Sequence, residues 1–331
     1  LVLIFVGVWR YFYYNKSMQK ISFVIPCYRS ENTIAKVVDE IRSTVQLRGE
    51  SAASNSEAYD YEIVLVNDCS PDNVWKVIKS LAQSDPKIKG ICLAKNFGQH
   101  SALLAGYAEA TGDMVVSLDD DGQTPASETF KLVDKLNEGY DVVYGFYEHS
   151  REHLFRRFGS WVNKKMAENI IGQPRTLKTT SFFIMRSFIA KEIVKYPNPF
   201  PYISGLVFRA TKNLGNVQVE HRSRIEGTSG YSIAGLLSLW INGFTAFSVK
   251  PLRFATFVGV FCALVGLVAG VYVIVQKFFH PDMLIGYTSM MATLLFVGGM
   301  IMLLLGFIGE YIGRIYICIN QSPQYVVREK V

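Results

Sequence analysis

Two long uncharged runs near the C-terminal end of the 331-residue chain restrict its fold more than any other feature. The first extends from Phe254 to Gln276 and the second from Gly286 to Gly309. At about 1.5 Å per residue, each run forms a helix long enough to cross a hydrocarbon layer about 30 Å thick. Two buried core helices are the alternative, but the length of the runs and the short linker between them favour a membrane-spanning hairpin over residues 251–313.

Basic residues around these runs predict the orientation of the hairpin. Lys250 and Arg253 precede the first run, and Arg314, Arg328 and Lys330 follow the second. Positively charged flanks stay on the cytoplasmic side of a membrane. We therefore expect a multi-pass protein of the cytoplasmic (inner) membrane, with the N-terminal domain and the tail, residues 314–331, in the cytosol.

Two further apolar segments accompany the hairpin. Apolar residues recur at helical spacing between Ile233 and Phe247, so we expect residues 231–250 to form an amphipathic helix in the membrane interface. A helix packed against the soluble domain is the alternative. The apolar stretch within residues 1–17 is too short to span, and Met18 stands just before a predicted strand. We expect residues 1–17 to be dispensable for activity.

The charge distribution argues against a nucleic-acid-binding protein. The net charge is +6, from 34 basic and 28 acidic residues, and only 19% of the residues are charged. Much of the positive excess flanks the apolar runs, whereas a nucleic-acid-binding domain concentrates it in its folded part. The five cysteines are widely spaced and form no C-x-x-C pair, which indicates reduced thiols and not a zinc site.

Residues 18–230 show the pattern of an α/β domain. Apolar strands are predicted at 21–25, 61–66, 91–93 and 114–118, and helical segments at 31–41, 74–81 and 101–110. This alternation predicts a mostly parallel sheet with helices on both faces, which binds its ligands at the carboxyl ends of the strands. Neither a G-x-G-x-x-G motif nor a P-loop follows any of these strands, so a dinucleotide-binding or P-loop fold is disfavoured.

The fourth predicted strand ends in three consecutive carboxylates, Asp119, Asp120 and Asp121, which Gly122 and Gln123 follow. Adjacent carboxylates repel one another, and a divalent cation at the strand end offsets this cost. Oxygen ligands suit Mg²⁺ or Mn²⁺, ions that bridge diphosphates. A solvated acidic turn is the alternative, but the apolar strand directly before the triplet favours a functional site.

Several short stretches form an ordered set along the chain. They are Phe23–Tyr28, Val66–Asp72, Asn96–Gln99, Ala105–Tyr107, Asp119–Gln123, His221–Tyr231, Phe247–Arg253 and Gly309–Tyr316. Together they resemble family 2 glycosyltransferases of the membrane-anchored, inverting polyprenyl-phosphate type, the group of dolichyl-phosphate mannose synthase and bacterial undecaprenyl-phosphate sugar transferases. The resemblance extends over nearly all of residues 20–327, and its specificity comes from the order of the motifs and the two runs that follow.

The resemblance implies a Rossmann-like GT-A domain over residues 18–230 and roles for the residues at its strand ends. Asp119, Asp121 and Gln123 would bind Mg²⁺ or Mn²⁺ on the donor diphosphate, and Asp119 and Asp121 would be the catalytic carboxylates. The residues that would bind the donor nucleotide-sugar are Pro26, Tyr28, Glu31, Asp68 and Asp120. A carboxylate such as Asp68 can accept a base N–H, and an Asx-turn role is its structural alternative.

The acceptor implied by the resemblance, a polyprenyl phosphate, needs cationic groups at the membrane surface. Arg156 and Arg157 lie in an amphipathic segment with aromatic neighbours, for which a solvated helix face is the alternative. Arg224 and Ser229 lie in the loop before the predicted interfacial helix. We expect these four residues to bind the acceptor, with Arg224 as the best single candidate.

The chain departs from the family pattern in three places. Tyr147 and Gly230 stand where many relatives carry an arginine and a lysine, and Thr180–Phe183 stands where many carry a carboxylate-Phe-Arg element. These changes do not remove the expected chemistry, because a phosphate monoester is largely dianionic at pH 7 and is already a nucleophile. A general base matters much less for it than for a hydroxyl acceptor.

The sequence thus predicts an inverting glycosyltransferase that moves a sugar from a nucleotide-sugar to a polyprenyl (undecaprenyl) phosphate at the cytoplasmic membrane face, for cell-envelope glycan assembly or modification. A UDP-sugar is favoured over a GDP-sugar, while the sugar and any homo-oligomer are left open. Two alternatives remain: transfer to a hydroxyl of a lipid-linked glycan, with Asp120 or Asp121 as the base, and a non-catalytic membrane scaffold with a decayed transferase domain.

Overall fold

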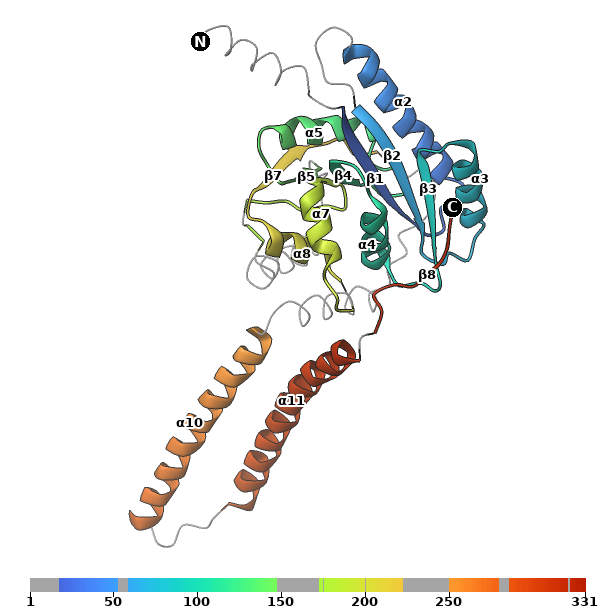
Figure 1. The fold of residues 1–331 in the computed structure, drawn as a ribbon. Helices are drawn as coiled ribbons and strands as arrows, with labels where there is room; N and C mark the ends of the chain where they lie inside the picture. Colours follow the sequence, from blue (N-terminus) through green and yellow to red (C-terminus); the bar gives the residue numbers. More distant parts are fainter. Residues whose placement is uncertain are drawn as a thin grey trace, which may run out of the picture. The chain divides into compact units, whose positions relative to one another are not determined.

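The computed structural model describes residues 18–52, 59–147, 173–174, 176–199, 201–222, 250–279, 286–320 and 322–331. They divide into two compact units. The first unit contains an eight-stranded sheet in the order β7-β5-β6-β4-β1-β2-β3-β8, with helices packed around it (Figure 1).

The centre of the sheet is parallel, as the alternating sequence pattern predicted. Its strands are β1 (Gln19–Cys27), β2 (Tyr59–Asn67), β3 (Ile88–Leu93) and β4 (Met114–Ser117). The helices that connect them are α2 (Ile34–Ala52), α3 (Val74–Ser84) and α4 (Gln99–Glu109). The last seven residues of β1 and the last six of β2 are all buried, as expected for strands covered on both faces.

The other half of the sheet is mixed. Its strands are β5 (Val142–Phe146), β6 (Phe183–Arg186) and β7 (Leu214–Gln218), and its helical segments are η1 (Ala126–Glu128), α5 (Thr129–Asn137), α7 (Ser187–Val194) and α8 (Ile203–Ala210). β6 lies between β4 and β5 and is antiparallel to both, while β7 is parallel to β5. The prediction of an α/β domain with a mostly parallel sheet is confirmed.

The C-terminal end of the chain supplies an edge strand of this sheet. β8 (Val327–Lys330) pairs antiparallel with β3, so it belongs to the first unit. The sequence alone predicts a tail here, because a four-residue strand with three charged side chains carries no apolar pattern. Its Arg328 and Lys330 are exposed, and charged side chains of this kind suit an edge strand because they discourage pairing with other chains.

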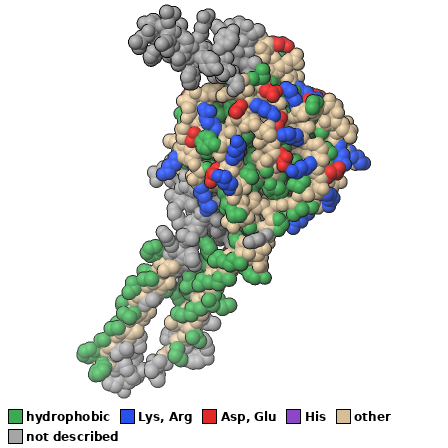
Figure 2. All heavy atoms as spheres, in the orientation of Figure 1, with side chains coloured by type: hydrophobic (Ala, Val, Ile, Leu, Met, Phe, Trp, Pro, Cys, Tyr) green, Lys and Arg blue, Asp and Glu red, His purple; other side chains and the backbone are tan. Residues whose placement is uncertain are grey.

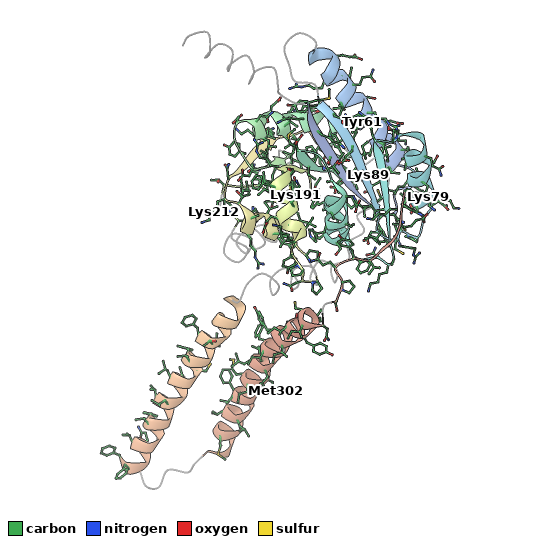
Figure 3. All side chains as sticks on the ribbon, viewed as in Figure 1. Tyr61, Lys79, Lys89, Lys191, Lys212 and Met302 are labelled. Atoms are coloured by element: carbon green, nitrogen blue, oxygen red, sulfur yellow. The ribbon has the colours of Figure 1, made fainter. Side chains whose placement is uncertain are left out.

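The described part of the second unit consists of two long helices, α10 (Lys250–Phe279) and α11 (Tyr287–Ile319). Many of their apolar side chains are exposed (Figure 2), and Met302 on α11 is 71% exposed (Figure 3). The segment Phe296–Ile319 is long and apolar enough to cross a membrane, whereas the apolar stretch of α10, Thr256–Tyr272, is shorter. Length and composition therefore support one spanning helix, in α11, and the first of the two predicted spans, Phe254–Gln276, is not confirmed. Residues 1–17 and 231–249 lie outside the described residues.

A buried carboxylate stabilises the first unit near the amino ends of the strands. Glu62 of β2 is 2% exposed and accepts a hydrogen bond from Ser22 Oγ (2.6 Å). It also pairs with Lys20 (3.0 Å) and with Lys89 (2.9 Å), which is labelled in Figure 3. Burial alone would raise the pKa of Glu62, but hydrogen bonds from Ser22, the Thr111 backbone and the two lysines lower it from 4.5 to about 2.

We expect Glu62→Gln to lower the free energy of unfolding by roughly 2–3 kcal/mol at pH 7. A carboxylate whose pKa is depressed on folding contributes stability that is present above pH 4.5 and is lost as the pH falls toward 2. Thermal unfolding in detergent should therefore show a difference from wild type that shrinks on acidification. Glu138→Gln, which breaks an exposed ion pair with Lys135, should have almost no effect. A Glu62→Gln deficit that is independent of pH would contradict this assignment.

Candidate functional site

Three loops meet at the carboxyl edge of the parallel strands. They follow β1, β2 and β4, and in the sheet β1 lies between the other two. Backbone hydrogen bonds continue the strand pairing into the loops, from Asp68 N to Cys27 O (3.2 Å) and from Leu118 N to Val24 O (3.2 Å). The sheet therefore brings Tyr28, Asp68 and the acidic triplet together from separate parts of the sequence.

Two of these loops begin with a left-handed backbone conformation. Arg29 has φ 57° and Cys69 has φ 50°, and among the described residues only these two non-glycine residues have positive φ. This conformation costs roughly 1–2 kcal/mol for an ordinary L-residue. Such strain concentrates at ligand-binding and active sites, where the surrounding structure holds it in place.

Hydrogen bonds between the β1–α2 and β2–α3 loops hold this conformation. Arg29 N donates to Ser70 Oγ (2.8 Å) and Glu31 N donates to Asp72 Oδ2 (3.0 Å). In return, Asn73 N donates to Glu31 Oε2 (2.7 Å). Glu31, which the sequence analysis assigned to donor binding, thus joins the two loops.

Two other residues predicted to bind the donor, Pro26 and Tyr28, differ in their exposure to solvent. Pro26 is buried within β1, where it lies opposite Val66 of β2. Tyr28 is 43% exposed, and the Arg29 guanidinium lies 5.5 Å from the centre of its ring. An exposed aromatic ring at this edge offers a face on which a nucleobase can stack.

Asp68 is buried and orders the loop before α4. It is 3% exposed, and its two carboxylate oxygens accept hydrogen bonds from Phe97 N (2.7 Å) and Gly98 N (2.8 Å). Burial raises the pKa of Asp68, and these two hydrogen bonds partly oppose the shift. Each carboxylate oxygen has a second lone pair, so Asp68 retains acceptor capacity for a further N–H.

The three carboxylates of the triplet have different partners. Asp120 Oδ2 accepts a hydrogen bond from Tyr28 N (3.0 Å), and burial, with Asp119 and Asp121 adding repulsion, raises the pKa of Asp120 to about 6. Asp119 accepts hydrogen bonds from Gln99 Nε2 (3.0 Å) at the start of α4 and from Ser181 Oγ before β6. Ser181 is one of the positions where the chain departs from the family pattern, and it directly contacts the predicted metal site.

The third carboxylate belongs to a tight turn. Gln123 N donates to Asp121 Oδ1 (3.0 Å) around Gly122, which has φ 67°. Among the described residues, no group of three or more His, Cys, Asp and Glu side chains is arranged to hold a metal ion. Asp119 and Asp121 nevertheless fit the mode in which Mg²⁺ takes one or two carboxylates and completes its coordination with substrate phosphates.

Residues after β7 also pack against the acidic loop. Arg222 N donates to Gln123 O (2.7 Å). The ring of His221 meets the Tyr147 ring edge-on, with centroids 4.2 Å apart, and the Tyr147 hydroxyl shares a hydrogen bond with Thr124 Oγ1 (2.6 Å). Tyr147, another departure from the family pattern, therefore lies beside the site, together with His221 from the matched stretch 221–231.

Several of these contacts were not predicted from the sequence. Thr124 directly follows the matched stretch Asp119–Gln123 and was not singled out, and neither was the link between Gln99 and Asp119, although both residues lie within matched stretches. Of the predicted acceptor residues, Arg156, Arg157, Arg224 and Ser229 all lie outside the described residues, so their roles stay predictions.

We expect Ser181→Ala to lower kcat about tenfold, because it removes a hydrogen bond to the Asp119 carboxylate worth roughly 1.5 kcal/mol. Ser181→Thr keeps the hydroxyl and should stay close to wild type. Sugar transfer measured over a range of Mn²⁺ concentrations tests this, and the alanine variant should need more Mn²⁺ for half-maximal rate. Equal behaviour of the two variants would show that the hydroxyl does not position Asp119.

Comparison with known proteins gives the following matches. Residues 22–194 match the family described as glycosyl transferase family 2, and residues 250–315 match the GtrB C-terminal hairpin. The chain is 30% identical to the SfII prophage-derived bactoprenol glucosyl transferase of Shigella flexneri, over 94% of this chain and 98% of that protein. It is also 30% identical to an undecaprenyl-phosphate 4-deoxy-4-formamido-L-arabinose transferase of Yersinia pestis, over 96% and 95% of the two chains.

Among solved structures, the chain is similar to a glucosyl-3-phosphoglycerate synthase from Mycobacterium tuberculosis in complex with Mn²⁺ and UDP-glucose. The identity is 18% and the TM-score is 0.49, over 68% of this chain and 76% of that one.

Proposed function

The chain belongs to glycosyltransferase family 2, and on this basis we propose that it transfers a sugar from a nucleotide-sugar to a polyprenyl phosphate. The observation that carries this proposal is the gathering of Asp68 and the Asp119–Asp121 triplet at one sheet edge, in a chain whose relatives are named as bactoprenol and undecaprenyl-phosphate sugar transferases. The family match and these relatives favour an enzyme over a non-catalytic membrane scaffold with a decayed transferase domain.

In the proposed reaction, a phosphate oxygen of the acceptor attacks C1 of the sugar from the face opposite the leaving group. The new C1–O bond forms as the C1–O bond to the diphosphate breaks, and the nucleoside diphosphate leaves with the electron pair. The anomeric configuration is inverted. Because the acceptor phosphate is largely dianionic at pH 7, no side chain has to remove a proton from it.

Different residues of this chain are proposed to bind different parts of the donor. Tyr28 supplies a ring for the base, and Asp68 supplies an acceptor for a base N–H. Asp119, Asp121 and Gln123 would hold Mg²⁺ or Mn²⁺ on the diphosphate, where the bound ion offsets charge on the leaving group. Pro26, Glu31 and Asp120 are also proposed to bind the donor; Glu31 and Asp120 in addition hold the loop backbone, through Asn73 N and Tyr28 N.

The acceptor is proposed to reach the site from the cytoplasmic leaflet of the inner membrane, to which the C-terminal helices anchor the enzyme. Support for Arg224 as its phosphate ligand comes from Arg222, whose backbone N–H binds Gln123 O. Arg224 follows two residues later, a distance of at most about 7 Å along the chain. Arg156, Arg157 and Ser229 complete the proposed acceptor site.

We expect Arg224→Ala to raise the KM for polyprenyl phosphate roughly ten- to a hundredfold and to leave the donor KM unchanged, since a lost charged hydrogen bond costs about 1.5–3 kcal/mol. Arg224→Lys should recover little, because an ammonium lacks the bidentate fork of a guanidinium. Steady-state kinetics with each substrate varied in turn separates the two effects. A rise in the donor KM alone would make the acceptor assignment wrong.

The direct test of the proposed function is a transfer assay with the purified full-length chain, Mn²⁺ and undecaprenyl phosphate. A panel of UDP- and GDP-sugars is supplied, and the glycolipid product is identified by mass spectrometry. We expect one donor to give a sugar-phosphate-lipid product. Product formed only with a lipid-linked glycan, and none with undecaprenyl phosphate, would favour hydroxyl transfer instead.

A further inference from the structure

We propose that the C-terminal strand β8 is a positioning element of the donor site, which holds the loop 94–98 against Asp68. This inference rests on the proposed function, because it assigns a consequence for donor binding. It starts from a topological fact: the chain leaves the sheet domain for α10 and α11 and then returns to add β8 beside β3.

The backbone of the C-terminal segment pairs with β3 between Val326 and Val331, with one shift of register between Cys92 and Leu93. Gly90 and Val331 exchange two hydrogen bonds, of 2.8 and 2.9 Å, at one end. At the other end, Ala94 N donates to Val326 O (2.8 Å). A Cβ at position 90 would lie 2.6 Å from side-chain carbons of Val331 and Ile78, so the glycine allows the close approach of β8.

Side chains on both faces of β8 reinforce this pairing. Glu329 accepts a hydrogen bond from Trp75 Nε1 (3.1 Å) and pairs with Lys79 of α3 (2.6 Å; Lys79 is labelled in Figure 3). Lys330 pairs with Glu109 at the end of α4 (2.7 Å). The strand is thereby fixed to the helices on either side of β3.

The contact that matters for the donor site is at Ala94, the first residue after β3. Its N–H is held by Val326, and its carbonyl accepts a hydrogen bond from Arg328 Nη2 (2.9 Å). Both backbone groups of Ala94 are thus bound by the C-terminal segment. Four residues on, the loop ends at Gly98, whose N–H donates to Asp68.

The short loop 94–98 therefore has one end fixed by the C-terminal segment and the other by Asp68. Phe97 N and Gly98 N can meet the two Asp68 oxygens only if the loop leaves β3 in the right direction. Without Val326 and Arg328, the Ala94 N–H loses its partner, and the Ala94 carbonyl keeps the weak contact from Cys69 Sγ (3.8 Å). Asp68 would then lose its orientation, and with it the acceptor proposed for the nucleobase.

The test compares UDP affinity by calorimetry in detergent for full-length protein, a variant that ends at Tyr325, and Arg328→Ala. We expect the truncation to weaken UDP binding at least tenfold and Arg328→Ala severalfold, with the KM for polyprenyl phosphate unchanged. Arg328→Lys, which can still donate to Ala94 O, should recover most of the affinity. Lys195→Ala is the control: it removes an exposed lysine ion pair, with Glu192 of α7, that takes no part in the β8 contacts, and it should not change UDP binding.

Two further measurements separate positioning from a general loss of folding. Hydrogen exchange should rise at Phe97 and Gly98 in the truncated protein, and a synthetic peptide of residues 323–331 should restore both protection and UDP affinity. UDP affinity within twofold of wild type in both the truncation and Arg328→Ala would overturn the inference. If the intact chain binds no UDP, the assignment of this site to the donor fails. Unchanged hydrogen exchange at Phe97 and Gly98 in the truncated protein would independently refute the claim that β8 holds the loop 94–98.

Discussion

Replacement of Asp121 by asparagine is expected to abolish detectable sugar transfer while the fold is retained. The asparagine Oδ1 can still accept the hydrogen bond that Asp121 receives from Gln123 N, so the turn around Gly122 should persist. What is lost is one of the two carboxylates proposed to hold the divalent cation on the diphosphate. Loss of such a ligand removes several kcal/mol of transition-state stabilisation, and each 1.36 kcal/mol is about a tenfold change in rate.

The measurement for Asp121→Asn is the rate of glycolipid formation at saturating Mn²⁺, together with the melting temperature. Asp134→Asn serves as the matched control, since Asp134 of α5 forms an exposed ion pair with Arg48 of α2 (2.9 Å). The control should keep wild-type activity. If Asp121→Asn turns over at a near-normal rate at saturating Mn²⁺, the metal assignment for this carboxylate is wrong.

Asp68→Asn is expected to raise the donor KM at least tenfold and to lower the free energy of unfolding by roughly 1–3 kcal/mol. Both Asp68 oxygens accept backbone N–H groups, from Phe97 and Gly98. An asparagine has one oxygen and one NH₂ group, so one buried backbone donor would face another donor. The loop 94–98 then loses a partner, and the site loses its proposed acceptor for the nucleobase.

Donor and acceptor kinetics of the Asp68 variant should be compared with those of Asp60→Asn. Asp60 lies at the other end of β2, where it forms an exposed ion pair with Lys87, and its substitution should leave both KM values unchanged. The acceptor KM of Asp68→Asn should also stay near wild type. An unchanged donor KM in a folded Asp68→Asn protein would limit Asp68 to holding the loop 94–98, because the Asx-turn alternative falls to Asn67, whose Oδ1 accepts the Ser70 N–H (3.0 Å).

The sequence determined those features that depend on local pattern. Buried parallel strands such as β1 and β2 are continuous apolar runs because helices cover both of their faces, so they could be predicted from the sequence alone. The carboxyl ends of parallel strands lie at one edge of a sheet, and this rule by itself predicts that Tyr28, Asp68 and Asp119–Asp121 lie together. The family resemblance, which rests on an ordered set of motifs, is likewise confirmed.

Only the tertiary structure decided which residues surround and orient that edge. Ser181 contacts Asp119 because β6 enters the sheet antiparallel between β4 and β5, and no periodicity in the sequence encodes that insertion. β8 pairs with β3 although the two strands are more than 200 residues apart in the sequence. The charged residues of β8 have the pattern of a solvated tail, and only the folded sheet supplies the edge with which their backbone pairs. Such contacts arise from the register of backbone hydrogen bonds between distant segments, whereas a sequence pattern reports only which face of its own segment is buried.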